Sequence, residues 1–447
     1  MSGAVRSRIL GVATAVPGHE FGQAEAAELA VSLLPGSSRA PGGAIDPRIE
    51  AMLRRVYSRS GIEKRRSVLP DFGSAPGARL LFPPSADFRP EPSTARRNAL
   101  YAASSPGLAL EAATRLLSGL GAEARGITHL VTASCTGFSA PGWDYELMKG
   151  LPLRPATARF NIGFMGCFAA FPALRLADHI VRSEAGARVL VVDLELCSLH
   201  YAIDASDEAL VANALFADGA AAALVAGDEG PASGPTLGIG PFVSRVIAGT
   251  ADEMAWTIGE TGFSMRLSSG VARSLGKEAP SLVDEVLAAG GLSRDQVRHW
   301  AVHPGGRAIL DAFESALGLG QESLLHPRAV LRDHGNMSSP TVLFVLERLL
   351  REALPGPVFA SAFGPGLLLE PYLAAAVIAA DLIRRTASAD FQEQWLPNIA
   401  TGETIVVIAH ADARNEPVTE LAGSLTGRKA VVAHGGCADL LLISAQT

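Results

Sequence analysis

The chain has 447 residues, 48% of them hydrophobic and 19% charged, a composition typical of a globular protein with a large buried core and not of a disordered or fibrous chain. Its formal net charge of −7 gives no basic field that would attract a phosphate backbone, so we expect no nucleic-acid partner. Its four cysteines include no CxxC pair and no cluster at metal-ligand spacing, which argues against a disulfide framework and against a metal site.

Two apolar stretches bear on where the protein works. Residues 9–16 follow two arginines but lead into Pro17 and polar sequence, so the run is too short for a signal peptide. Residues 372–383 contain Asp381 and are too short to span a bilayer. We therefore expect a cytoplasmic protein with reduced thiols and no membrane insertion.

In chain order, short apolar runs typical of buried strands alternate with amphipathic segments typical of helices, which predicts α/β layering. The strand-like runs are residues 127–134, 188–195, 220–225, 299–303 and 358–362, and the clearest helix-like segments are 281–289 and 340–352. Residues 226–240 are rich in Gly, Pro and Ser and indicate a connecting loop between two such stretches. Two stretches of the same kind suggest a duplicated architecture.

These patterns divide the chain into three parts. We expect an N-terminal half over residues 1–230, a C-terminal half over residues 231–374 and a tail over residues 375–447. The tail begins with a helix-like segment, residues 374–385. It continues with three β-like stretches, residues 404–410, 429–434 and 439–444.

Cys167 is the first candidate for chemistry. It follows the Gly-Phe-Met-Gly turn of residues 163–166 and precedes an apolar, helix-like run over residues 168–181. A thiol at a helix N-terminus is shifted towards the thiolate by the macrodipole and by free backbone N–H groups. The alternative is a buried, inert cysteine. Pro172 is expected in the second turn of this helix, where it would introduce a kink.

A thiolate nucleophile also needs a proton acceptor and donors for an oxyanion. His303 ends a predicted strand on a Pro-Gly-Gly turn, and Asn336 lies in the Gly-Asn-Met-Ser-Ser-Pro sequence just before a predicted helix. The alternatives are a structural histidine and a simple helix-capping turn. Each of these motifs is weak by itself.

Together and in this order, the three segments resemble the Cys, His and Asn motifs of the type III polyketide synthases, the chalcone and stilbene synthase family. The resemblance runs from about residue 8 to residue 373, and it includes residues 134–137, 141–142, 215–221 and 363–367. It implies the thiolase fold, an α/β fold of five layers (αβαβα) built from two related halves, here with a small β-rich C-terminal appendage. It also implies a homodimer that uses acyl-CoA and malonyl-CoA as substrates and needs no cofactor.

The same resemblance implies a role for each residue. Cys167, as a thiolate paired with protonated His303, would take the acyl group of a starter. His303 and Asn336 would then stabilise the enolate formed when malonyl-CoA loses CO2. Phe216 matches the family's gating phenylalanine, and Phe263 matches a second one, although either could be a core aromatic.

A cationic helix segment precedes Gly61 and carries Arg54, Arg55 and Arg59. Charge runs usually form solvated faces. Because this segment resembles the family's CoA-binding helix, we expect Arg55 and Arg59 to bind CoA phosphates.

The expected cavity wall departs from the plant enzymes. Cys135, Cys197 and His200 stand where chalcone synthase-like sequences have threonines. The sequence around them is more similar to that of bacterial alkylpyrone and alkylresorcinol synthases. We therefore expect a fatty acyl starter and pyrone or resorcinol products. Cys135 could instead be a second acyl carrier, but nothing near it in the sequence supplies a base.

Several alternatives stay open from the sequence. One is another thiolase-fold condensing enzyme, either an initiating β-ketoacyl carrier-protein synthase or a hydroxymethylglutaryl-CoA synthase. The tail after residue 390 resembles the start of the β-domain of acyl-CoA dehydrogenases, which suggests a flavoprotein scaffold. The matching motif is truncated, so we expect no flavin. A non-catalytic interaction protein on the same fold is a third alternative.

Overall fold

The computed structural model describes most of the chain up to residue 376 and, beyond it, residue 390 and four short segments. The described residues are 7–34, 45–72, 78–82, 90–227, 235–268, 270–353, 356–376, 390, 406–409, 419–421, 424–426 and 440–443. Among these residues, no helix is both long and apolar enough to cross a membrane.

The first half forms a five-stranded arrangement in the order β5 (Ala158–Gly163), β4 (His129–Ser134), β6 (Arg188–Leu196), β7 (Asp218–Gly227) and β1 (Ser7–Ala15). β4 runs parallel to both of its neighbours, whereas β7 is antiparallel to β6 and to β1. Strands β4, β6 and β7 are almost entirely buried, which explains why they read in the sequence as continuous apolar runs.

The second half repeats this pattern with four strands side by side instead of five. Its strands are β12 (His299–Val302), β13 (Gly356–Gly364), β14 (Leu368–Ala376) and β8 (Leu237–Phe242), and the two-residue β9 (Arg245–Val246) pairs with β14. β12 is parallel to β13, and the next two pairings are antiparallel. In both halves a parallel pair of strands, β4–β6 and β12–β13, is followed across the sheet by two antiparallel pairings, which is the duplicated architecture expected from the sequence.

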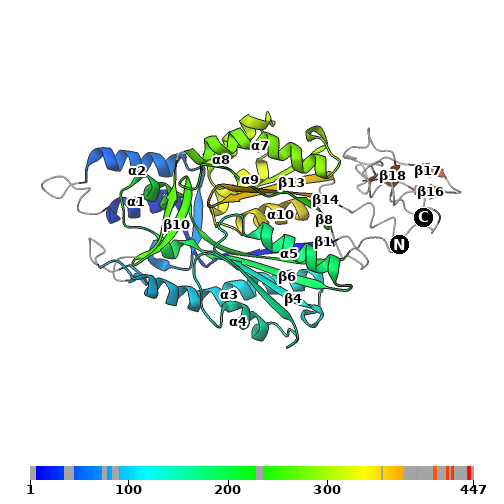
Figure 1. Cartoon of the computed structure of the whole chain (residues 1–447), viewed down its shortest axis with the longest axis horizontal. Helices are drawn as coiled ribbons and strands as arrows, with labels where there is room; N and C mark the ends of the chain where they lie inside the picture. Colours follow the sequence, from blue (N-terminus) through cyan, green and yellow to red (C-terminus); the bar gives the residue numbers. More distant parts are fainter. Residues whose placement is uncertain are drawn as a thin grey trace.

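Helices separate and cover the two halves, as Figure 1 shows. α5 (Ala170–Ser183) and α10 (Thr341–Arg351) form the central layer, in which α10 contacts strands of both halves. α3 (Thr94–Leu120) and α4 (Trp143–Gly150) lie outside the first half. The outer helices of the second half are α7 (Gly270–Ala289), α8 (Arg307–Leu317) and α9 (Leu325–His334). This gives the five layers of the expected fold.

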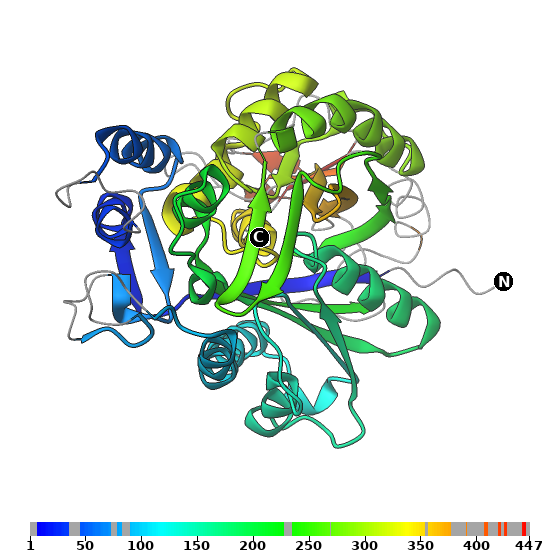
Figure 2. The same ribbon diagram turned by 60° about the vertical axis from the view of Figure 1, so that its left-hand side comes forward.

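A cap of short elements lies at one end of the molecule (Figures 1 and 2). It contains the pair β2 (His19–Gly22) and β3 (Lys64–Ser67) with α1 (Gln23–Leu33) and α2 (Pro47–Arg59). α6 (Asp207–Leu215) packs against α1 and α2. The hairpin of β10 (Met254–Gly259) and β11 (Gly262–Leu267) packs against α6. Four 3-10 turns complete the described part: Pro70–Phe72, Ala124–Gly126, Cys197–His200 and Arg294–Gln296.

Three sequence expectations need correction. Pro172 lies in the first turn of α5, since the helix begins at Ala170, and a missing N–H has no intrahelical partner to lose there. Residues 237–240, expected in the connecting loop, belong to β8, which pairs with β1 and β14. Residues 374–376, expected to start a helix, end β14, because they are hydrogen-bonded between β13 and β8.

The tail contains short strands in its described segments. β15 (Val406–Ala409) pairs in parallel with β18 (Leu440–Ile443), and β16 (Thr419–Leu421) forms a hairpin with β17 (Ser424–Thr426). The β-like stretches 404–410 and 439–444 thus contain strands. The third stretch, 429–434, and the segment 377–385 lie outside the described residues.

Candidate active site

The turn before α5 carries Cys167 in a buried position, with 4% of the residue exposed. Gly166 has a φ of +80°, and a side chain there would lie 2.3 Å from Pro365. A side chain at Gly364 would likewise lie 2.3 Å from Phe168. The glycines therefore allow the Phe-Gly-Pro-Gly loop that follows β13 to pack directly against the cysteine turn.

Asn336 lies in the equivalent turn, just before α10. Its Nδ2 donates a hydrogen bond to the Gly305 carbonyl at 3.1 Å, and its Oδ1 accepts one from the Ser338 N–H at 2.8 Å. Ser338 has a left-handed φ of +59°, which is costly for a residue with a side chain. Its Oγ lies 3.4 Å from the Cys167 Sγ and donates to it. The asparagine turn therefore touches the sulfur.

His303 follows β12 and is completely buried. Its N–H donates to the Ser361 carbonyl at 2.8 Å, and its ring meets the Phe363 ring edge-on at 5.3 Å between centroids. Within the described part of the chain, neither ring nitrogen has a hydrogen-bond partner. A buried imidazole with both nitrogens unpaired is available to a reacting group.

A series of hydrogen bonds connects the three loops. The Ser338 hydroxyl donates to the Cys167 sulfur, the Ser338 N–H donates to the Asn336 side chain, and the Asn336 amide donates to the carbonyl of Gly305, two residues after His303. The structure thus brings the three predicted catalytic residues into one contiguous set of loops at the ends of strands and helices.

Burial sets the charge state of this site. It raises the pKa of Cys167 to about 12, against a smaller lowering by the Ser338 hydrogen bond, and it lowers the pKa of His303 to about 3. The expected shift towards thiolate at a helix N-terminus is therefore opposed by desolvation. Burial penalises an isolated charge of either sign, so it favours the neutral thiol and the neutral imidazole.

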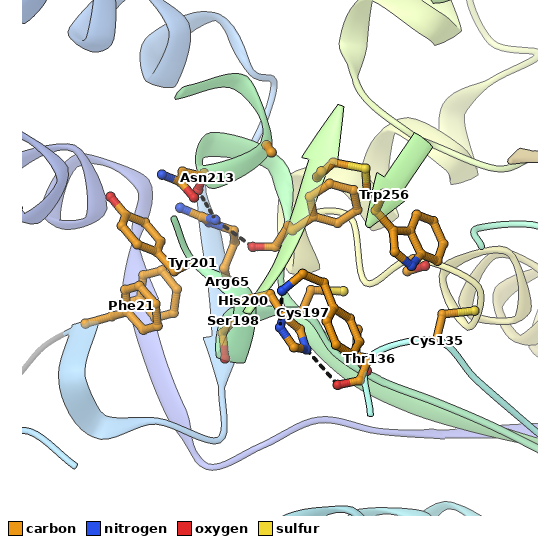
Figure 3. A pocket seen from close by; sticks show the side chains of 16 residues that line it. Phe21, Arg65, Cys135, Thr136, Cys197, Ser198, His200, Tyr201, Asn213 and Trp256 are labelled. Atoms are coloured by element: carbon orange, nitrogen blue, oxygen red, sulfur yellow. Dashed lines mark hydrogen bonds between the residues drawn. The ribbon is translucent and has the colours of Figure 1, made fainter. Parts of the chain in front are cut away.

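A cavity lies beside these loops and extends into the cap (Figure 3). Its atom-free space, counted with its opening to solvent, is about 680 Å3. All three predicted wall residues and both predicted gating phenylalanines line it: Cys135, Cys197, His200, Phe216 and Phe263. Ser338 is also part of the wall, whereas Cys167, His303 and Asn336 are not among the residues that line the cavity. Figure 3 shows Cys135 and Trp256 at one end and Phe21 and Tyr201 at the other.

Two family models match consecutive parts of the chain. The model described as "Chalcone and stilbene synthases, N-terminal domain" matches residues 6–229, and the corresponding C-terminal domain matches residues 242–378. The chain belongs to the chalcone and stilbene synthase family. It is thus a type III polyketide synthase with an acyltransferase-type activity, and the alternative of another thiolase-fold condensing enzyme is less well supported.

Known relatives agree with this membership. "Alpha-pyrone synthesis polyketide synthase-like Pks18" of Mycobacterium tuberculosis is 32% identical over 387 residues, which cover 84% of this chain and 91% of the relative. Among solved structures, PKS-I from the brown alga Ectocarpus siliculosus is 32% identical with a TM-score of 0.76, covering 83% of this chain and 99% of that one. The C-terminal type III polyketide synthase domain of Steely1 from Dictyostelium is 26% identical with a TM-score of 0.75, covering 83% and 100%.

Cys135 lies directly under the nucleophile turn of this family member. Its Sγ accepts a hydrogen bond from the Gly166 N–H at 3.0 Å, and burial, with Glu195 nearby, raises its pKa well above the ordinary value. Burial likewise raises the pKa of Cys197.

His200 is held in one tautomer by its neighbours. Its Nδ1 accepts a hydrogen bond from the Phe263 N–H at 3.1 Å, so its Nε2 carries the proton and donates to the Thr136 carbonyl at 2.7 Å. The ring stacks on Phe263 with 4.0 Å between centroids, and burial lowers its pKa to about 4. Neutral His200 therefore fixes Phe263 and the β10–β11 hairpin against the cavity wall.

Phe216 follows α6 and pairs with Asn336 across a parallel bridge. The buried Arg65 guanidinium donates to the Phe216 carbonyl at 2.6 Å and to the Asn213 carbonyl at 2.8 Å, which fixes the backbone of this segment. The sequence analysis missed Arg65. Its position in β3, between exposed Lys64 and half-buried Arg66, gives only a weak signal for a buried arginine.

α2 contains four arginines, and the three in its second half, Arg54, Arg55 and Arg59, differ in their contacts. Arg54 is paired with Glu28 and Glu50. Arg55 and Arg59 are exposed, and their side chains have no ion pair with any described residue. The structure therefore leaves free the two arginines that the sequence analysis selected for CoA phosphates. In the part of the chain that is described, no group of three His, Cys, Asp or Glu side chains could hold a metal ion.

Proposed function

We propose that this polyketide synthase condenses malonyl-CoA, with loss of CO2, onto an acyl group carried by Cys167. The observation that supports these assignments best is the contact of the Cys167 Sγ with Ser338, in the same turn as Asn336 and one hydrogen bond from the His303 loop. We assign to these loops a nucleophile, a proton acceptor and an amide donor, and Ser338, which contacts the sulfur, lines a largely apolar cavity.

The first step loads the starter. His303 takes the Cys167 proton as the sulfur attacks the thioester carbonyl of an acyl-CoA, and free CoA leaves with that proton. Charge develops on the carbonyl oxygen, and an N–H donor aimed at it stabilises the transition state. The acyl group then remains as a thioester on Cys167.

The second step extends the chain. The Asn336 amide and a protonated His303 nitrogen donate hydrogen bonds to the malonyl-CoA thioester oxygen, so loss of CO2 leaves a stabilised enolate. The enolate carbon attacks the acyl thioester, the bond to the Cys167 sulfur breaks, and a β-ketoacyl-CoA forms. Reloading onto Cys167 with release of CoA allows another extension before the chain cyclises.

The cap supplies the proposed entrance. Arg55 and Arg59 bind the CoA phosphates, since they are exposed cations on α2, and α2 packs on α6. Phe216, which follows α6, and Phe263 on β11 separate this entrance from the sulfur. Both line the cavity, which supports a gating role.

We further propose a medium or long fatty acyl starter and tri- or tetraketide pyrone or resorcinol products. The cavity wall is largely apolar and carries the neutral groups Cys135, Cys197 and His200, which suits an acyl chain. A relative with 32% identity is named for alpha-pyrone synthesis, which favours pyrones.

A second copy of this chain is the partner we propose. β5 is an edge strand with mostly exposed residues, among them Phe160, which is 41% exposed. Phe164, which follows the strand, and Phe138, whose ring lies 6.4 Å from that of Phe164, are 42% and 53% exposed. Exposed edges and aromatic patches of this kind are typical of an interface. The described cysteines are unbridged, and catalysis needs a free thiol, so we propose the cytoplasm as the site of action. The condensation itself is redox-neutral and needs no cofactor besides the CoA substrates.

The proposal is tested by incubating purified protein with malonyl-CoA and a ladder of acyl-CoA starters from acetyl to long-chain, without carrier protein, and measuring product masses. We expect products that combine a medium or long acyl chain with two or three malonyl-derived units, and none from the Cys167→Ala variant. Rejection of every starter longer than acetyl would overturn the fatty acyl assignment. A requirement for carrier protein would overturn the use of free CoA thioesters.

A further inference from the structure

Two carboxyl side chains lie completely buried behind the nucleophile turn. Asp193 and Glu195 are alternate residues of β6, both 0% exposed, on the face of the strand that meets the central helices. Such groups are costly to bury and need either a partner or a proton. No step of the proposed reaction uses either of them.

One hydroxyl group joins them. The Ser339 Oγ lies 2.6 Å from Asp193 Oδ1 and 3.2 Å from Glu195 Oε1. A serine hydroxyl has one hydrogen and can donate it to only one of two carboxylates. For both contacts to be hydrogen bonds, one carboxyl must itself carry a proton and donate it to Ser339.

The other contacts identify which carboxyl carries the proton. Glu195 accepts the Cys135 N–H at 3.0 Å on both oxygens and the Thr136 hydroxyl at 2.7 Å, which suits an ionised group. Asp193 Oδ2 has no partner among the described residues. Burial raises the pKa of both carboxyls, that of Glu195 to about 7 and that of Asp193 well above its usual range. The larger number of donors to Glu195 favours hydrogen bonds that run from protonated Asp193 to Ser339 and from Ser339 to ionised Glu195.

Ser339 also belongs to the strained turn of the active site. It follows Ser338, whose left-handed backbone is held on its other side by the Asn336 Oδ1. A strained backbone persists only where its surroundings hold it. Ser339 is hydrogen-bonded to the two carboxyl groups and thereby restrains the strained backbone of Ser338.

We propose that Asp193 is a positioning residue: it shares one proton with Glu195 through Ser339, and thereby keeps the turn of Asn336 and Ser338 against the Cys167 sulfur. This inference rests on the proposed function for its consequence in catalysis. The arrangement of the pair is independent of it.

The arrangement makes opposite demands on the two carboxyls. Asparagine at 193 can donate the same hydrogen bond to Ser339 as a protonated aspartate. Glutamine at 195 cannot accept all the donors that the carboxylate accepts, because one of its two oxygens becomes an NH2 group facing Cys135 or Thr136. Asp193→Asn and Glu195→Gln each replace one carboxyl oxygen by an NH2 group and leave the size of the side chain nearly unchanged. They are therefore matched controls for each other.

The test compares these two variants and Asp193→Ala by three measurements. They are malonyl-CoA decarboxylation, the rate of Cys167 alkylation by iodoacetamide, and the thermal unfolding temperature. We expect Asp193→Asn to stay within about 3-fold of the parent in both rates, and Glu195→Gln and folded Asp193→Ala to lose about 10-fold or more in decarboxylation. The infrared band of one protonated carboxyl should disappear from Asp193→Asn at neutral pH.

The pH profile gives a further readout. Burial and the Glu195 charge raise the pKa of Asp193 well above its usual range, so Asp193 ionises only at high pH. Its charge would then face Glu195 on the same strand, Cys135 after β4 and Cys167 before α5. We expect the parent enzyme to lose decarboxylation at alkaline pH more steeply than Asp193→Asn, which cannot ionise.

The outcomes separate this inference from the proposed function. A silent Glu195→Gln together with an impaired Asp193→Asn would reverse the proton assignment and overturn the inference. Equal, small effects in both variants would also overturn it. If the parent shows no decarboxylation, the proposed function fails, while the alkylation rates and the infrared difference still decide whether the pair shares a proton as described.

Discussion

At the reacting sulfur, burial and hydrogen bonding act in opposite directions. Desolvation raises the pKa of Cys167, and the Ser338 hydroxyl lowers it by a smaller amount. His303 is buried and its pKa is lowered, so it favours the neutral form that can accept a proton. In the proposed loading step a proton passes from the thiol to the imidazole, which moves no net charge into the interior. We therefore expect the two groups to titrate as a pair.

Replacing His303 by alanine should remove the proton acceptor and leave a thiol with a raised pKa. We expect alkylation of Cys167 by iodoacetamide at neutral pH to slow by about 10-fold or more, since each pKa unit changes the thiolate fraction tenfold. The rate in the variant should keep rising as the pH increases above 9, whereas the parent should be reactive from a lower pH. Equal pH profiles for parent and variant would show that His303 does not set the thiolate.

Replacing Asn336 by alanine should remove one donor to the enolate. A loss of about 100-fold to 1,000-fold in malonyl-CoA decarboxylation is expected, as for the loss of one oxyanion donor. Acylation of Cys167 by the starter serves as the control, because it should fall less. Unchanged decarboxylation would require a different role for Asn336.

The residues that could be predicted from the sequence are those with a chemical motif. Cys167, His303 and Asn336 each lie beside glycines or a proline at the end of a predicted element. Functional side chains are often found at such positions, so this pattern can be recognised in the sequence alone. Ser338, Arg65 and Asp193 could not be found in this way. Their roles depend on contacts between segments far apart in the chain, such as Ser339 with Asp193, that no local pattern records.

At the scale of elements, two equivalent turns carry residues of the proposed active site. The turn before α5 holds Cys167, and the turn before α10 holds Asn336 and Ser338, so the duplicated halves bring their central helices to one place. The strands and central helices could be predicted because their apolar runs are long. The end of β14 could not, because a run of alanines is compatible with a helix and only pairing with β13 and β8 decides for a strand.

The exposed face of α2 offers a test of substrate binding. Reversing the charge of Arg55 and Arg59 together should raise the KM for CoA substrates by about 10-fold while changing kcat less, because the phosphates are far from the reacting carbon in both ground and transition states. Arg48→Glu, an exposed change at the start of the same helix, is the control. The effect should shrink at high salt. A KM equal to that of the control would show that both arginines are only solvated surface charges with no role in CoA binding.

For the molecule as a whole, the proposed catalytic residues lie within the two halves matched by the family models. The second sheet is completed by β14, which ends at Ala376 between β13 and β8. The described strands of the tail pair only with each other. Small units of this kind bury little apolar area.

A chain ending at Arg385 should therefore stay dimeric and keep its turnover, with a modest loss of thermal stability at most. The measurements are product formation and size-exclusion chromatography. A chain ending at Leu367, which lacks β14, is the control and should fail to fold, because it leaves β13 and β8 unpaired in the middle of the sheet. If a chain ending at Arg385 were folded but inactive, or if the full-length protein bound flavin stoichiometrically, the tail would have a function in the enzyme.

The most direct test of the central claim is intact-protein mass spectrometry after exposure to an acyl-CoA starter, followed by peptide mapping. We predict a mass increase equal to one acyl group, located on Cys167, and its discharge when malonyl-CoA is added. The Cys167→Ala variant should fold and show no such increase. Acylation at Cys135 or Cys197 instead, or product formation by Cys167→Ala at the parent rate, would contradict the assignment of Cys167 as the carrier of the growing chain.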